Sequence, residues 1–266
     1  MITEQRIADF QGIWDLISEQ KYDDKISRNR SSYLYRGMPN AAFHLATSLS
    51  RNCKDKSFDI EKPILRNFTK YASIEDPKLE DSVWRQLIIG QHHGLPTRLL
   101  DLTYSPLIAL HFATSGESFS QMDENDCVVW AIDIDEINSL LPKKYKKQLD
   151  KESSYLFTVE MLDSLVQCLD EYDTDMEDSS MILIEPPSID QRIINQYSYF
   201  SIVPKEIEDI EDFLASNTEH TIKYVIDRAL KWRIRDMLDQ LNVNERIVFP
   251  GLDGLTAWIK RHYYVK

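Results

Sequence analysis

The stretch Gln91-His92-His93-Gly94-Leu95-Pro96-Thr97-Arg98-Leu99-Leu100-Asp101 brings two imidazoles, an amide, a hydroxyl, a guanidinium and a carboxylate close together. Apolar residues precede it at the spacing of a buried helix face: Val83, Trp84, Leu87 and Ile88. Gly94 suits a left-handed turn that ends this helix. After the stretch, Ser105-Pro106 provides an N-cap and a first-turn proline for an apolar helix, which Gly116 can end. The sequence therefore predicts two buried helices that hold one polar loop.

The polar side chains of this loop have a structural interpretation beside the functional one. A histidine near a helix C-terminus, as His92 and His93 would be, often bonds a free carbonyl or favours the helix dipole. Arg98 and Asp101 lie three residues apart and could pair to brace the loop. Adjacent histidines on a helix point about 100° apart, so we expect no metal site here.

The net charge of −13 would repel phosphate backbones and anionic lipid surfaces. The chain has one basic run, Lys143–Lys147, despite its net negative charge. A run of this length is typical of a solvated helix face. We therefore expect neither a nucleic acid nor a membrane surface as the partner.

The three cysteines are too few and too scattered for a disulfide framework, which indicates a reducing compartment. The N-terminus lacks a basic stretch followed by an apolar segment, and no run of about eighteen apolar residues occurs. Hydrophobic residues make up 42% of the chain, which is ample for a core. These features predict a globular cytoplasmic protein.

Strand-like and helix-like segments follow one another irregularly, without steady βα units. The predicted helices include residues 4–19, 60–72, 159–169 and 207–214. The predicted strands cover residues 33–35, 43–49, 127–134, 181–184, 197–203 and 220–226. The acidic stretch 170–180 is the best linker candidate, and Ser188 with Gln191 forms a capping box for the next helix. We expect one α+β domain, residues 1–266 with a core from about 32 to 260, in which mixed and antiparallel strands pack with helices.

Polar side chains collect at predicted strand ends. Arg36 ends the first strand, and Gly37 would let a backbone or a ligand approach closely. Thr47 and Ser48 lie on the next strand, where they could also cap a turn, and Glu185 ends a short strand stopped by two prolines. We expect these groups to share a concave site with residues of the central loop: Gln91, His92, Thr97, Arg98 and Asp101.

This set of side chains suits an anionic nucleotide. The sequence contains no GxxxxGK[ST], no GxGxxG after a strand, no G-x-S-x-G and no HExxH. The motifs that most often indicate a nucleotide hydrolase, a dehydrogenase or another hydrolase are therefore absent. An arginine can clamp a pyrophosphate, and a carboxylate can stabilise the cationic sugar formed when the glycosidic bond of NAD breaks. Arg36 and Glu185 have this chemistry.

Several motifs resemble the FRG-domain family. The central signature reads Gln91–Gly94, Thr97–Asp101 and Ser105–Leu110, the Phe-Arg-Gly triplet that names the family reads Tyr35-Arg36-Gly37, and Phe249–Leu255 is similar to the C-terminal segment of the family. The segment Gln196–Phe200 resembles a Gln-x-Gly-x-Phe element of the family, without its glycine.

The resemblance implies a fold and a site, because FRG domains look like distant relatives of ADP-ribosyltransferases. Their sites begin with a strand-end arginine followed by a strand that carries Thr or Ser. The resemblance therefore implies an ADP-ribosyltransferase-like core. The catalytic candidates are Arg36, His92, Arg98, Asp101 and Glu185, and the NAD-binding candidates are Arg36, Gly37, Thr47, Ser48, Gln91 and Thr97. The catalytic carboxylate could be Glu185, Asp101 or Asp253.

We expect an NAD-consuming ADP-ribosyltransferase or NAD glycohydrolase, a toxin or defence effector with a macromolecular target and no metal. Two alternatives stay open. One is a non-catalytic module that binds a nucleotide or phosphorylated ligand through Arg36, His92 and Arg98. The other is an effector that processes RNA or protein, which would require a contiguous basic cleft. Release of nicotinamide from NAD separates the enzyme from the binding module.

Overall fold

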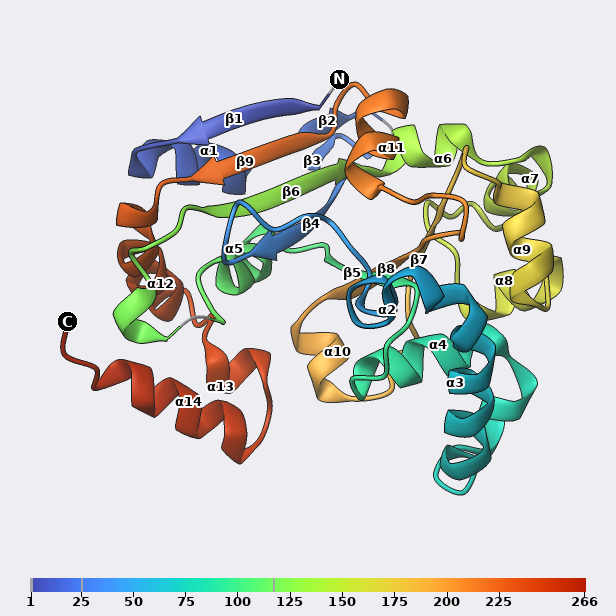
Figure 1. Ribbon diagram of the computed structural model, residues 1–266. Helices are drawn as coiled ribbons and strands as arrows, with labels where there is room; N and C mark the ends of the chain where they lie inside the picture. The colour runs from blue at the N-terminus through green and yellow to red at the C-terminus, as the bar shows by residue number, and fades with distance from the viewer. Residues whose placement is uncertain (1, 25, 117) are drawn as a thin grey trace.

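A mixed seven-stranded sheet organises the part of the chain that the computed structural model describes, residues 2–24, 26–116 and 118–266 (Figure 1). Its strands in spatial order are β1 (Thr3–Ile7), β9 (Ile222–Ile226), β6 (Cys127–Asp133), β4 (Tyr33–Met38), β5 (Leu99–Thr103), β8 (Ser198–Ile202) and β7 (Ile182–Ile184). β1 and β9 are parallel, and the other neighbours are antiparallel. β2 (Lys21–Asp23) and β3 (Arg28–Arg30) form a separate antiparallel pair. This architecture confirms the predicted α+β class with mixed strands.

The sheet consists of two groups of strands that meet at one point. In the described residues, β4 and β5 share one register pair, Tyr35 with Thr103, whereas β4 pairs with β6 along its whole length. The first group is β1-β9-β6-β4, which lies across the top of Figure 1, and the second is β5-β8-β7, near the centre of the view. The short contact between β4 and β5 leaves room for a pocket between the groups.

Helices cover both groups. They are α1 (Phe10–Ser18), α2 (Ser48–Cys53), α3 (Ser57–Ala72), α4 (Val83–His92), α5 (Pro106–Ala113), α6 (Ile134–Leu140), α7 (Lys143–Glu152), α8 (Val159–Leu165), α9 (Leu169–Met176), α10 (Gln191–Asn195), α11 (Ile210–Asn217), α12 (Lys231–Gln240), α13 (Glu245–Val248) and α14 (Leu252–His262). Residues of α1, α5 and α12 share an apolar cluster with the first group, and those of α4, α8 and α9 share one with the second. None of the described helices is long and apolar enough to cross a membrane.

A further apolar cluster joins the two groups. Leu34 and Trp130 of the first group are buried in the same cluster as Leu100 and Leu183 of the second. Contact between the groups therefore depends on side-chain packing more than on the backbone ladder.

The two helices predicted around the polar stretch are present. Ser82 caps α4 by accepting a hydrogen bond from the N–H of Arg85 (3.2 Å), and Ser105 caps α5 in the same way. Gly94 follows α4 with φ of +85°, the left-handed conformation expected there. Ser105 and Gly94 predicted the start of α5 and the end of α4 correctly, because each has a local hydrogen-bonding or conformational cause. The cap at Ser82 was not predicted.

The prediction of one helix over residues 4–19 is wrong at its N-terminal end. Thr3–Ile7 form β1, and α1 begins after Asp9, whose side chain accepts a hydrogen bond from the N–H of Gly12 (3.1 Å). Ile7 fits the helical spacing, but it lies buried in the strand. Long-range pairing of β1 with β9 overrides the local pattern.

The strand predicted over residues 43–49 is also wrong. Thr47 instead caps α2, accepting a hydrogen bond from the N–H of Ser50 (3.1 Å), so β4 has no hairpin partner there. β5 occupies the end of the predicted polar loop. Its residues are buried except Asp101, so the strand shows no regular alternation of exposed and buried positions.

The predicted linker at residues 170–180 is largely helical. α9 covers Leu169–Met176, and its Asp173 is buried in contact with Arg98. The helix predicted over residues 159–169 ends earlier, as α8. The capping box is replaced by Asp190, which caps α10 by accepting a hydrogen bond from the N–H of Ile193 (3.0 Å). An acidic segment can thus be ordered when its carboxylates have buried partners.

Candidate functional site

A pocket of about 230 Å³ lies where the two strand groups meet, and we call it the Arg36 pocket. Its lining comes from β4 (Tyr35, Arg36, Gly37), α4 (Gln91, His92), β5 (Asp101, Leu102, Thr103), α5 (Phe112) and the segment from α10 to β8 (Arg192, Gln196, Ser198, Phe200). The register pair of Tyr35 and Thr103 forms part of the wall. The pocket is therefore a consequence of the junction in the sheet.

Arg36 extends from β4 with a side chain that is 15% exposed. Its Nη1 donates to the main-chain oxygen of Asp101 at 2.7 Å and lies 3.5 Å from the carboxylate oxygen Oδ2. Its Nε is buried and has no hydrogen-bond partner among the described residues. Burial lowers the pKa of Arg36, Asp101 opposes the change and the charge of Arg51 adds to it. The guanidinium is only partly satisfied by the protein.

Gly37 serves packing between the sheet and α5. A Cβ at this position would lie 1.8 Å from the main-chain oxygen of Ala109. The close approach predicted at Gly37 is therefore that of a helix backbone, and it sets the position of Arg36 relative to α5.

Asp101 is held by a chain of hydrogen bonds. Gln91 Nε2 donates to Asp101 Oδ2 at 2.9 Å, and Gln91 Oε1 accepts from Thr97 Oγ1 at 2.7 Å and from Ser48 Oγ at 3.0 Å. In the described residues no bond reaches Oδ1, and the carboxylate side chain is 56% exposed. Thr97 and Ser48 thus orient Gln91, Gln91 orients Asp101, and one carboxylate oxygen stays available.

His92 connects α4 to α10. Its Nε2 pairs with Oδ2 of Asp190, the residue that caps α10, and its side chain is 9% exposed. Burial lowers the pKa of His92, although the neighbouring Asp190 opposes this change. Nε2 donates to the carboxylate of Asp190, which makes His92 a positioning contact between the two helices.

Arg98 does not line the Arg36 pocket. Its side chain is 3% exposed and binds Glu61 with two nitrogens, one at 2.8 Å, and Asp173 with a third. Burial by itself would lower the pKa of Arg98, but the bonds to Glu61 and Asp173 raise it. Arg98 was expected in the site, but its donors are occupied by carboxylates of α3 and α9 instead. The predicted Arg98–Asp101 pair is also replaced by these partners.

Glu185 follows β7 and is exposed outside this pocket. β8 lies between β7 and β5, so a strand separates Glu185 from Asp101. Its negative charge adds to the effect of burial in raising the pKa of Tyr199. Of the three carboxylates that the sequence proposed for catalysis, Asp101 is the one that lines the Arg36 pocket.

Sequence reasoning gave no role to several residues that line the pocket: Phe112, Arg192, Gln196, Ser198 and Phe200. Arg192 rests on the ring of Phe249, with its guanidinium carbon 5.3 Å from the ring centroid. Among the described residues, no carboxylate forms an ion pair with it. The resemblance of Gln196–Phe200 to an element of the FRG family was the one available signal for this wall.

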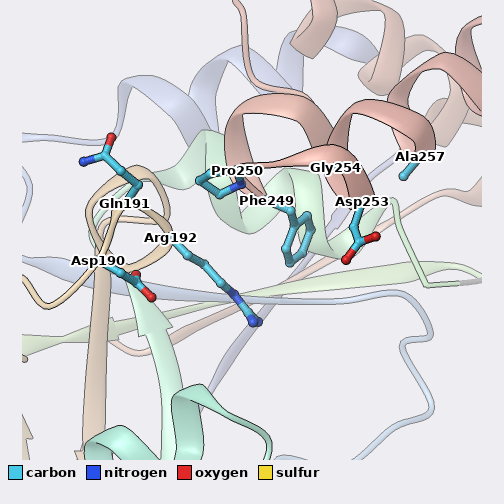
Figure 2. A pocket seen from close by; sticks show the side chains of 8 residues that line it. All are labelled: Asp190, Gln191, Arg192, Phe249, Pro250, Asp253, Gly254 and Ala257. Carbon is cyan, nitrogen blue, oxygen red and sulfur yellow. The ribbon is translucent and has the colours of Figure 1, made fainter. Parts of the chain in front are cut away.

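A second pocket of about 550 Å³ adjoins the first at Arg192, which lines both, and we call it the Asp253 pocket. It lies between the start of α10 and the start of α14 (Figure 2). In that view Arg192 and the ring of Phe249 lie between Asp190 and Asp253. The described residues show no side-chain partner for Asp253.

The comparisons with known proteins give one match. Residues 31–122 match the family model of the FRG domain, a segment that runs from just before β4 to just past α5. This confirms the resemblance within the matched segment, which contains Arg36, Ser48, Gln91, His92 and Asp101; residues 196–200 and 249–255 lie outside it. Arg192 and the Asp253 pocket lie beyond it. Neither the search of curated proteins nor that of solved structures found a match.

Proposed function

We propose that the protein is an NAD-consuming enzyme with an ADP-ribosyltransferase-like core, and that it cleaves the bond between ribose and nicotinamide in the Arg36 pocket. One observation carries the proposal. In a chain of net charge −13, this pocket is lined by two guanidiniums and one carboxylate, and the carboxylate is oriented with a free oxygen. Such a lining favours an anionic ligand that becomes cationic at one carbon during reaction.

Arg36 and Arg192 would hold the pyrophosphate of NAD. Asp101 would face the ribose through Oδ1. The bond from C1′ to the pyridinium nitrogen breaks, and its electron pair leaves on nicotinamide, which becomes neutral. The ribosyl cation then accepts a lone pair from water or from a side chain of a target, and the acceptor loses its proton. A macromolecular acceptor would suit a toxin or defence effector.

Replacement of Asp101 tests this assignment. We expect Asp101→Asn to lower kcat for nicotinamide release by about 100-fold with KM for NAD little changed, because the charge acts mainly in the transition state. Release is measured by liquid chromatography, with and without candidate acceptor proteins. Asp236→Asn, an exposed carboxylate on α12 outside both pockets, is the matched control and should keep full activity.

Glu185→Gln is the discriminating variant. If Glu185→Gln abolishes release while Asp101→Asn retains it, with melting temperatures unchanged, the reaction does not use the Arg36 pocket as proposed.

A non-catalytic nucleotide-binding module is the second candidate. It is favoured by the hydrogen bonds that Asp101 Oδ2 already accepts from Gln91 and Arg36. A carboxylate with these partners can serve to position the arginine and have no part in catalysis. Saturable NAD binding without nicotinamide release from the wild type would support this module.

A further inference from the structure

The Arg36 pocket is too small for a whole dinucleotide. At about 230 Å³ it lies below the usual range for pockets that enclose drug-sized ligands, roughly 300–1,000 Å³. A nucleotide with two nucleosides therefore needs a second chamber, and the Asp253 pocket provides about 550 Å³.

Three contacts make the two pockets neighbours. Arg192 lines both. His92 of the first pocket pairs with Asp190 of the second. The rings of Phe112 and Phe249, one from each pocket, meet edge to face with centroids 6.1 Å apart. The two pockets are therefore neighbours, with Arg192 at their boundary.

The lining of the Asp253 pocket suits a nucleoside. Arg192 lies with one side against Phe249, so its other side can stack on a planar base, as guanidiniums do. Asp253 is exposed and can accept hydrogen bonds from a pair of ribose hydroxyls or from an exocyclic amine. A phosphate group would lie at the boundary between the Arg36 pocket and the Asp253 pocket, beside Arg192.

The position of Asp253 relative to Phe249 is fixed by packing. A Cβ on the adjacent Gly254 would lie 1.8 Å from the main-chain oxygen of Phe249, so α14 approaches this segment as closely as a glycine permits. Arg261 of α14 also binds Glu245 of α13, with Nε to Oε1 at 2.7 Å. The carboxylate is thus presented by a helix that is anchored at both ends.

We propose that the Asp253 pocket binds the purine nucleoside half of the dinucleotide, with Asp253 on the ribose or base and Arg192 at the phosphate. This inference rests on the proposed binding of NAD, because the scissile end must lie beside Asp101 in the smaller chamber. The adenosine half is then left for the larger chamber.

Two half-ligands test the assignment by isothermal titration of the full chain. Nicotinamide mononucleotide probes the Arg36 pocket, and AMP probes the Asp253 pocket. We expect Asp253→Asn to raise the Kd of AMP about tenfold and to leave that of nicotinamide mononucleotide unchanged. The substitution removes the charge of a hydrogen-bond acceptor in the Asp253 pocket and does not alter the Arg36 pocket. Arg192→Gln should weaken both ligands, because the guanidinium lies at the boundary.

Matched controls come from the same part of the fold. Arg246 also stacks on an aromatic ring, 4.9 Å from the centroid of Trp258, but it lines neither pocket, so Arg246→Gln should change neither Kd. Asp236→Asn should likewise have no effect. Melting temperatures of all variants verify folding.

Two results would overturn the inference. One is a wild type that does not bind AMP, and the other is an equal effect of Asp253→Asn on both half-ligands. Neither depends on turnover, so a protein that binds AMP as expected but releases no nicotinamide would refute the proposed reaction and leave the nucleoside chamber standing.

Discussion

The partners of an arginine decide whether it can serve a ligand. Arg98 has its donors occupied by two buried carboxylates. Arg36 has one carboxylate contact at 3.5 Å and an unsatisfied Nε, and the guanidinium of Arg192 lies on an aromatic ring, with no carboxylate partner among the described residues. The capacity of the guanidinium N–H groups to bind a ligand therefore increases from Arg98 to Arg36 to Arg192.

Loss of the Arg98 side chain should destabilise the fold. Arg98→Met would leave the carboxylates of Glu61 and Asp173 buried without their cation, and we expect the free energy of unfolding to fall by about 3–5 kcal/mol. Urea denaturation followed by circular dichroism measures the change. Arg6, which is 55% exposed and also contacts two carboxylates, Asp126 and Asp227, gives the control. Arg6→Met should cost only a small fraction of that loss, and equal losses would contradict the buried role of Arg98.

At the residue scale, the sequence identified many of the chemical groups but not all of their partners. Arg36, Gln91, His92 and Asp101 were expected in one site, and all of them line the Arg36 pocket. Arg98 was expected beside them, but its partners come from α3 and α9, far away in the chain. No local pattern encodes such a contact, because burial and pairing arise only when these elements pack.

At the scale of elements, the helices and strands that could be predicted are those specified by residues close together in the sequence. The cap at Ser105 and the buried strand β6 were predicted from nearby residues. β1 and β5 were missed because their hydrogen-bond partners, β9 and β8, lie far along the chain. The sequence predicted a helix and a strand where α10 and β8 lie, but not that they line the pocket, because that position depends on the pairing of β8 with β5.

A buried histidine on α5 should make stability depend on pH. His111 Nδ1 accepts a hydrogen bond from Arg235 Nη1 at 3.0 Å, and its side chain is fully buried. Burial, and next the charge of Arg235, lower its pKa from 6.5 to about 3. The folded protein therefore keeps His111 neutral where the unfolded chain binds a proton. This contribution to stability is present above pH 6.5 and is lost as the pH falls toward 3.

The pH prediction can be isolated between pH 6.5 and 5. In this window His111 should lower the free energy of unfolding by up to about 1.4 kcal/mol per pH unit. Glu245, whose pKa is held at about 2 by Arg261 and Arg235 against the effect of burial, loses its contribution only at lower pH, below its ordinary value of 4.5. His111→Gln keeps an acceptor for Arg235 but cannot titrate. Urea unfolding of both proteins across the window should show a shallower slope for the variant, and parallel slopes would refute the assignment.

At the scale of the whole molecule, the Arg36 pocket depends on both strand groups. Arg36 comes from the first group, and Asp101 and Ser198 come from the second. The backbone ladder joins the groups at one register pair in the described residues, so the apolar cluster of Leu34 and Leu100 must hold them in register. The geometry of the site is thus as stable as the contact between the groups.

The two groups should unfold together. Trp84 is buried on α4 in the cluster of the second group, and Trp130 is buried on β6 of the first, in the cluster that joins them. In the full chain labelled with 5-fluorotryptophan, the native fluorine resonances of these two residues should disappear at the same urea concentration, because the shared cluster couples the groups. Trp→Phe variants assign the resonances. Loss of NAD binding should coincide with both, whereas a Trp130 resonance that outlasts that of Trp84 would show that the groups open separately and that the site is lost before the fold.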